Sequence, residues 1–119
     1  MADQSLLVKK YVDAAIAHGE ASKIGDYKIA NREYDKLTRI YRKLEKDRTL
    51  AIAIIHELFQ NPNYLVLGWA SAHAIGLNIS IDKAEKTLGE ISKRTDIGIV
   101  RLTAEMTLKE WKKKGKLTF

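Results

Sequence analysis

Between Glu57 and Asp82 the chain carries no charged side chain, and this stretch constrains the fold more than any other. The part from Tyr64 to Ser80 reads YLVLGWASAHAIGLNIS and is too long for an ordinary loop. Polar residues interrupt it, and its most apolar part is shorter than the roughly 20 residues that a membrane span requires. A helix with apolar or small residues around most of its circumference is a buried helix. We therefore expect residues 62–77 to form the central, buried helix of a soluble protein.

The rest of the chain is also patterned for helices. The sequence has a single proline, lacks runs in which apolar and polar residues alternate, and is rich in Ala, Leu, Ile, Lys and Glu. Gly25 and Asp26 separate the first two helices, and Ser80 is the expected cap of the fifth. Asn61 is expected to cap the fourth helix, with Pro62 as its first residue. The predicted helices span residues 3–23, 26–46, 49–60, 62–77, 81–93 and 96–114, followed by a short tail at 115–119.

A repeated spacing suggests how these helices stack. Val66 and Ala70 are four residues apart in the fourth predicted helix, and Val100 and Ala104 repeat this spacing in the sixth. Small residues on one helix of a hairpin allow its neighbour to approach closely. The sequence thus predicts a single all-α domain over residues 1–119. We expect a right-handed α-α superhelix of about three stacked helical hairpins, in which the second, fourth and sixth helices line a concave face.

Three segments carry a resemblance to a known family: GDYKIANREYDKL at 25–37, NPNYLVLGWASAHAI at 61–75, and DIGIVRLTAEMTLKEWKKKG at 96–115. Together they resemble the bacterial family named domain of unknown function 2019, whose fold is a small right-handed stack of HEAT-like or armadillo-like hairpins. The resemblance implies this fold but no catalytic residue, because that family has no established activity. By analogy with small bacterial HEAT-like proteins encoded beside toxin genes, it also suggests an immunity-type inhibitor of a bacterial toxin.

Residue patterns for catalysis or metal binding are weak. The chain has no cysteine, which excludes disulfides and thiolate metal sites. His18, His56 and His73 lie on three different predicted helices, so no two of them share a helix face at the spacing of metal ligands. No P-loop, G-x-G-x-x-G or G-x-S-x-G pattern occurs. We therefore expect a protein that is not an enzyme and that uses no cofactor or metal.

The polar residues that stand out are Asn31, Tyr34 and Asp35 on the second predicted helix, where Asn31 and Asp35 are four apart and share a face. This patch is a candidate site for a partner protein. The alternative is that Asn31 and Tyr34 connect the second helix to its neighbours by hydrogen bonds. Arg101 and Glu105 are the corresponding candidates on the sixth helix. The leading hypothesis from the sequence is a non-enzymatic protein–protein interaction module that binds its partner through these five residues.

The net charge of +6 supports a second hypothesis. Basic residues are frequent in the second predicted helix and in the tail KKKGK, although acidic residues are interleaved in the helix and Asp35 is expected to pair with Arg39. Nucleic-acid binding would use the basic residues of both regions and would depend strongly on salt. The candidate residues for it are Arg32, Arg39, Lys43, Lys112, Lys113 and Lys114.

The opening stretch MADQSLLVKKYVDAAIAHGE has neither the basic n-region nor the continuous apolar core of a secretory signal. Together with the absence of cysteine, this indicates a reducing compartment. We expect a cytoplasmic protein without membrane contact, present as a monomer or a homodimer, whose partner is another protein or, less favoured by the charge pattern, a nucleic acid.

Overall fold

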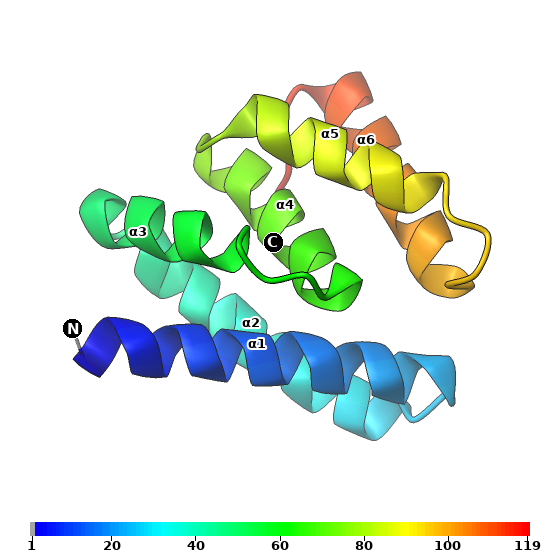
Figure 1. Ribbon diagram of the computed structural model, residues 1–119, viewed down its shortest axis with the longest axis horizontal. Coiled ribbons are helices and arrows are strands. Elements are labelled where there is room, and N and C mark those ends of the chain that lie inside the picture. The colour runs from blue at the N-terminus through cyan, green and yellow to red at the C-terminus, as the bar shows by residue number, and fades with distance from the viewer. Residues whose placement is uncertain (1) are drawn as a thin grey trace. The chain divides into compact units, whose positions relative to one another are not determined.

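The computed structural model describes residues 2–119 as six α-helices, with no strand in this range (Figure 1). The helices are α1 (Ala2–Lys23), α2 (Tyr27–Glu45), α3 (Arg48–Leu58), α4 (Tyr64–Leu77), α5 (Ile81–Ser92) and α6 (Ile99–Lys114). The predicted all-α class and the six helices are confirmed. The helices group into two compact units, of which the first ends at Asn61 and the second runs from Pro62 to Phe119.

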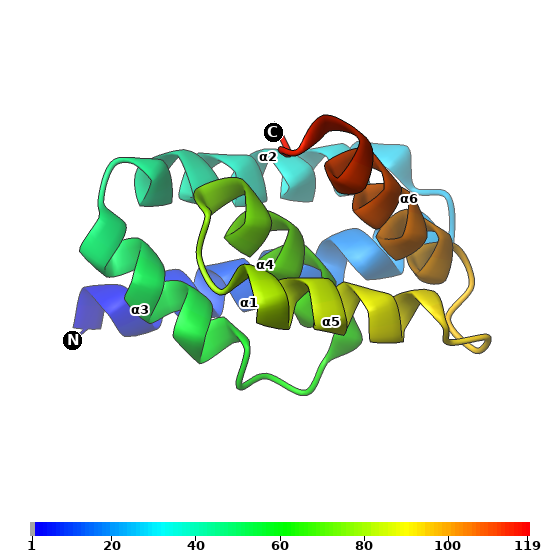
Figure 2. The same ribbon diagram turned by 90° about the horizontal axis from the view of Figure 1, so that it is seen from above.

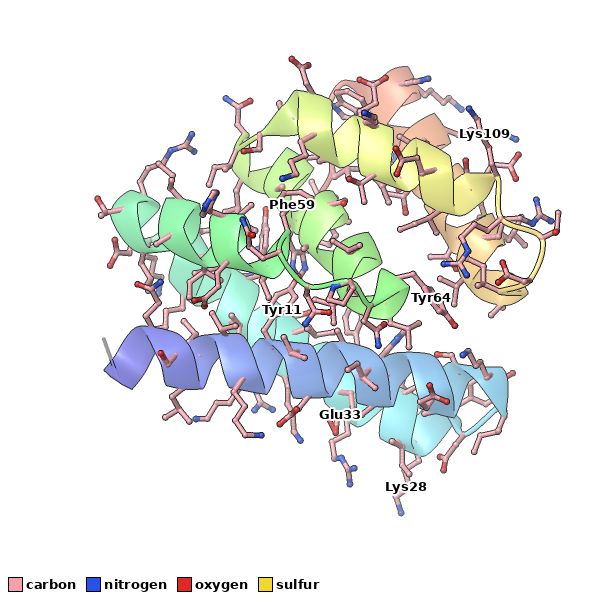
Figure 3. The ribbon with its side chains drawn as sticks, viewed as in Figure 1. Tyr11, Lys28, Glu33, Phe59, Tyr64 and Lys109 are labelled. Carbon is pink, nitrogen blue, oxygen red and sulfur yellow. The ribbon has the colours of Figure 1, made fainter. Side chains whose placement is uncertain are left out.

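In the first unit, α1 and α2 form an antiparallel hairpin, and α3 packs against both helices. Gly25 makes the turn of the hairpin with a φ of 73°, a left-handed conformation that suits glycine. Asp26 then begins α2, because its side chain accepts a hydrogen bond from the Ile29 N–H at 3.2 Å. All three helices contribute apolar side chains that are fully buried: Tyr11, Ala15, Leu37, Leu44, Ile54, Ile55 and Leu58. Tyr11 is labelled in Figure 3.

In the second unit, α5 packs against α4 and α6, and α4 also meets α6 (Figure 2). The uncharged segment forms α4, and every residue from Ala70 to Ile75 is buried. Because an α-helix has 3.6 residues per turn, such a run covers all sides of the helix. The prediction of a buried helix in this segment is confirmed.

One expected hairpin falls across the boundary between the units. The segments predicted at 49–60 and 62–77 were expected to pair, but α3 belongs to the first unit and α4 to the second. Their pairing, and the stacking of hairpins into a superhelix, therefore stay predictions.

The start of α4 differs from the predicted one. The helix begins at Tyr64 and not at Pro62, because Asn63 is its N-cap. The Asn63 Oδ1 accepts a hydrogen bond from the Leu65 N–H at 2.8 Å, which satisfies a backbone donor that the first turn leaves open. Asn61, the expected cap, lies before the proline and outside the helix.

The start of α6 is also later than predicted, at Ile99 and not at residue 96. Arg94 donates from Nε and Nη2 to the two carboxylate oxygens of Asp96, at 3.1 and 2.7 Å. Gly98 then takes a φ of 57°, so the chain turns between Asp96 and the helix. The other helix ends lie within two residues of the predicted ones.

Within the second unit, the C-terminal residues pack against α4. Gly115 ends α6 with a φ of 72°, and Leu117 is buried. The Phe119 ring meets the ring of His73 edge-on at 4.8 Å, and Trp69 lies 5.4 Å from the same histidine ring. The segment predicted as a short tail therefore covers part of α4. None of the helices within residues 2–119 has the length and apolar character that crossing a membrane requires.

Candidate functional site

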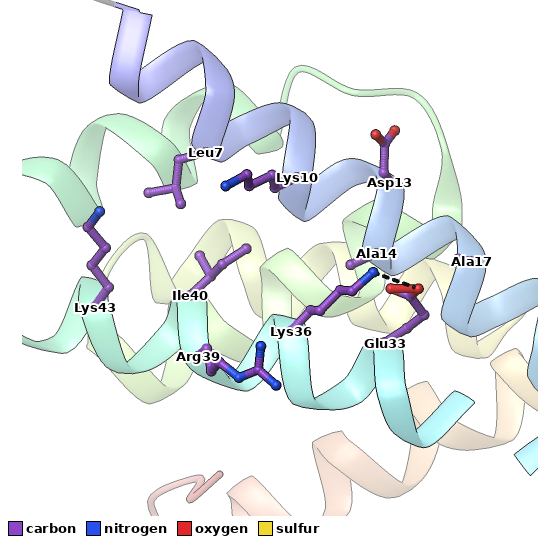
Figure 4. Close-up of a pocket in the computed structure, with 10 residues that line it drawn as sticks. All are labelled: Leu7, Lys10, Asp13, Ala14, Ala17, Glu33, Lys36, Arg39, Ile40 and Lys43. Atoms are coloured by element: carbon purple, nitrogen blue, oxygen red, sulfur yellow. Dashed lines mark hydrogen bonds and ion pairs between the residues drawn. The ribbon is translucent and has the colours of Figure 1, made fainter. Parts of the chain in front are cut away.

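An open groove runs between α1 and α2, with a volume of about 610 Å³ (Figure 4). The α1 side is formed by Leu7, Lys10, Asp13, Ala14 and Ala17. The α2 side is formed by Glu33, Lys36, Arg39, Ile40 and Lys43. Because the two helices are antiparallel, the start of α1 lies opposite the end of α2. The residues that line the two ends of the groove differ in charge, so we describe the groove as two halves.

The first half, which we call the basic half, consists of Leu7, Lys10, Arg39, Ile40 and Lys43. Leu7 and Ile40 form an apolar floor, and the three cationic side chains surround it from both helices (Figure 4). All three cations are exposed, and none forms an ion pair with a residue that the structure describes. The basic half therefore presents positive charge that the described chain does not neutralise.

The expected ion pair between Asp35 and Arg39 is not formed among the described residues. Arg39 lines the groove, whereas Asp35 is exposed on α2 and does not line it. The spacing of four residues allows such a pair on a helix but yields only about 0.2–0.5 kcal/mol, which is too little to fix two exposed side chains.

The other half, the mixed half, contains Asp13, Ala14, Ala17, Glu33 and Lys36. Glu33 is only 4% exposed, and its carboxylate accepts a hydrogen bond from the Lys36 Nζ at 3.1 Å. The Arg32 Nη2 lies 3.5 Å from the same carboxylate oxygen. A carboxylate removed from water is costly unless it is paired, so Lys36 is engaged by Glu33. Asp13 is likewise paired, by Lys9 at 2.7 Å.

His18 lies on α1 just beyond Ala17 and is half-buried. Burial lowers the pKa of His18 below its usual value of 6.5, and the negative charge of Glu33 partly opposes this shift. The imidazole is therefore mainly neutral at pH 7. As a result, the positive charge near the groove at neutral pH comes from lysine and arginine.

The residues predicted to bind a partner lie on both units. On α2, Asn31 and Asp35 are exposed and Tyr34 is 40% exposed, and none of the three lines the groove. Neither Asn31 nor Asp35 forms a side-chain hydrogen bond with another described residue, so the alternative in which Asn31 connects α2 to its neighbours gains no support. On α6, Arg101 and Glu105 form an ion pair at 3.8 Å.

The basic residues of the second hypothesis are also divided. Arg32, Arg39 and Lys43 belong to α2 in the first unit, and the three lysines Lys112–Lys114 form the last turn of α6 in the second. Lys114 pairs with Glu110 at 2.9 Å, and Lys112 lies 3.9 Å from Glu85. Cations at this end of a helix also complement its dipole.

Sequence reasoning missed Lys10 and Leu7 as site residues. The first predicted helix has no excess of basic residues, so the charge of Lys10 did not stand out. The available signal was the helical spacing of Leu7, Lys10, Ala14 and Ala17, which places them along one face. That signal gains meaning only once α1 is known to lie against α2.

Comparison with known proteins finds no matching family model, no similar curated protein and no similar solved structure. Among the described residues, no cluster of three or more His, Asp or Glu side chains could hold a metal ion. The groove between α1 and α2 is therefore the feature on which a functional proposal can be built.

Proposed function

We propose that this chain is a non-enzymatic protein–protein interaction module and that its binding surface includes the α1–α2 groove. The observation that carries the proposal is the basic half, where an apolar floor of Leu7 and Ile40 is surrounded by three cations that form no ion pair with a described residue. An apolar centre with a polar rim is the usual composition of protein interfaces. Apolar contact supplies affinity, while the charges steer the encounter and select the partner.

The proposal includes a finer architecture than six helices. We infer a single HEAT-like or armadillo-like domain, a right-handed superhelix of about three stacked hairpins, as the family resemblance implies. The packing of α1 with α2, of α4 with α5 and of α5 with α6 supports hairpins as the building block. In this proposal the exposed polar residues Asn31, Tyr34 and Asp35 on α2, and Arg101 and Glu105 on α6, are further contacts of the partner.

A more specific role is that of a cytoplasmic immunity-type inhibitor, with a bacterial toxin as the partner. It is supported by the analogy with small HEAT-like bacterial proteins and by the basic character of the groove, which suits an acidic protein. The identity of the neighbouring genes tests this role, because an immunity protein is expected beside the gene of its toxin.

Affinity purification of the tagged chain from its native host tests the general proposal. We expect one protein to be recovered in a fixed ratio to the chain, and light scattering of the purified complex to give the mass of that assembly. Recovery of no protein above background, or of nucleic acid alone, would contradict the proposal.

A second candidate function is nucleic-acid binding. It is favoured by Lys10, Arg39 and Lys43, and by Lys113 in the last turn of α6, none of which forms an ion pair with a described residue. Basic groups that the protein does not neutralise are available to phosphates. The two functions differ in whether the apolar floor of the groove contributes to binding.

A further inference from the structure

The two halves of the α1–α2 groove specify the chemistry of what fills it. We propose that the groove binds an acidic amphipathic helix of a partner protein, with its carboxylates over the basic half and its C-terminal end at Leu7. This inference rests on the proposed protein-binding function and adds the class and the orientation of the ligand.

The shape of the groove favours a helix. From Leu7 to Ala17 it follows α1 for ten residues, a length of about 15 Å or nearly three helical turns. A third helix can pack along two neighbouring helices at an axis separation of about 8–10 Å. The small side chains of Ala14 and Ala17 leave room for close approach at one end. Binding of an extended peptide by β-strand addition would need the edge of a sheet, and residues 2–119 contain no strand.

The charges of the basic half favour an acidic ligand. Lys10 reaches the groove from α1, and Arg39 and Lys43 reach it from α2, so carboxylates on one ligand helix can be contacted from both sides (Figure 4). Carboxylates four residues apart lie on the same face of a helix and match this arrangement. An arginine such as Arg39 can also bind a carboxylate through two parallel hydrogen bonds.

The mixed half sets the orientation. Glu33 and Asp13 are already paired there with Lys36 and Lys9, so a further carboxylate would meet two negative groups, and the cation that lines this half, Lys36, is already engaged. Acidic residues of the ligand are therefore expected at the other end, beside Leu7. The C-terminal end of a helix carries the negative pole of its dipole and is also favoured next to cations. The dipole thus directs the ligand helix antiparallel to α1, and the charges of the two halves place its acidic residues beside Leu7.

A designed peptide provides the probe. It is a helix-stabilised peptide of about 14 residues with Glu and Leu along one face, and its counterpart carries Lys in place of Glu. Methyl NMR of the full chain should show shifts at Leu7, Ala14, Ala17 and Ile40 with the Glu peptide and none with the Lys peptide. A nitroxide at the C-terminus of the Glu peptide should broaden the Leu7 methyls more than the Ala17 methyl.

Two double variants on or beside α2 provide a test and its matched control. Arg39→Glu/Lys43→Glu reverses two charges inside the groove, and Lys28→Glu/Lys46→Glu reverses two exposed charges outside it. We expect the first to weaken peptide binding by about tenfold or more and the second by less than about twofold. Circular dichroism of both variants verifies that the helices are retained.

Several outcomes would overturn the inference: absence of groove shifts at millimolar Glu peptide, shifts confined to α6, equal binding of the Lys peptide, or stronger broadening at Ala17. Experiments on the native complex distinguish failure of the acidic-helix inference from failure of the proposed protein-binding function. A partner that binds the Arg39→Glu/Lys43→Glu variant as tightly as the native chain leaves protein binding in place and rejects the acidic helix. Failure to recover any partner rejects the proposed function itself.

Discussion

His18 loses water on folding, and this burial lowers its pKa, with Glu33 acting in the opposite direction. Below a pH of about 6.5 the unfolded chain therefore takes up a proton at this site more readily than the folded chain. The stability that neutral His18 contributes is present above that pH. It is lost progressively as the pH falls toward the lowered pKa of the folded state.

Replacement of His18 by Gln should flatten this pH dependence. Urea unfolding at pH 7.5 and pH 5.5 should show a smaller difference in unfolding free energy for His18→Gln than for the native chain. His56→Gln is the matched control, because it removes an exposed histidine of α3. The pKa of Asp96 is lowered from its usual value of 3.8, so this carboxylate stays ionised at both pH values and does not affect the comparison. If the difference in unfolding free energy between the two pH values is the same for His18→Gln as for the native chain, His18 is not a source of the pH dependence.

At the scale of the elements, the start of α5 stores strain. Ser80 was the expected cap and does occupy the N-cap position, but its φ is 49° and its side chain makes no cap hydrogen bond. A left-handed conformation costs most L-residues about 1–2 kcal/mol, whereas glycine adopts it without this cost. Asn78, at the end of α4, has a similar φ of 59°, and asparagine tolerates it better.

Ser80→Gly should therefore stabilise the protein. The relief of strain exceeds the extra backbone entropy of glycine, so we expect a gain of about 0.5–1 kcal/mol in the free energy of unfolding. Ser80→Val should lower it by more than about 1 kcal/mol, because a β-branched residue tolerates this conformation poorly. Urea unfolding curves measure both changes. A glycine variant less stable than the native chain would show that this turn relaxes without cost.

The helices could be predicted from the sequence more reliably than their first residues. Spacing of apolar residues identifies each helix because burial of one face decides its stability. The segment NPN offers two asparagines as caps for α4, and only the backbone shows that Asn63 and not Asn61 reaches the N–H of Leu65. The interaction of Arg94 with Asp96 that precedes α6 is equally local and equally invisible in the apolar pattern.

At the scale of the whole molecule, the groove could be predicted only in part. Arg39 and Lys43 stood out because the second predicted helix is rich in basic residues. Lys10 and Leu7 join them only through the packing of α1 against α2, which no local pattern states. The prediction that Asp35 pairs with Arg39 was wrong, so Arg39 adds to the positive charge of the groove more than the sequence suggested.

The net charge of +6 predicts how nucleic acid should behave toward this chain. Attraction of phosphates to scattered surface cations depends on the number of charges and on salt, and little on position. We expect a short DNA duplex to be retarded in gel shifts at low salt and released near physiological salt. Arg39→Glu/Lys43→Glu and Lys28→Glu/Lys46→Glu should weaken this retention alike, since each reverses two charges on or beside α2. The Glu peptide should distinguish the same two variants. A DNA interaction that Arg39→Glu/Lys43→Glu alone abolishes, and that prefers one sequence, would instead identify the groove as a nucleic-acid site.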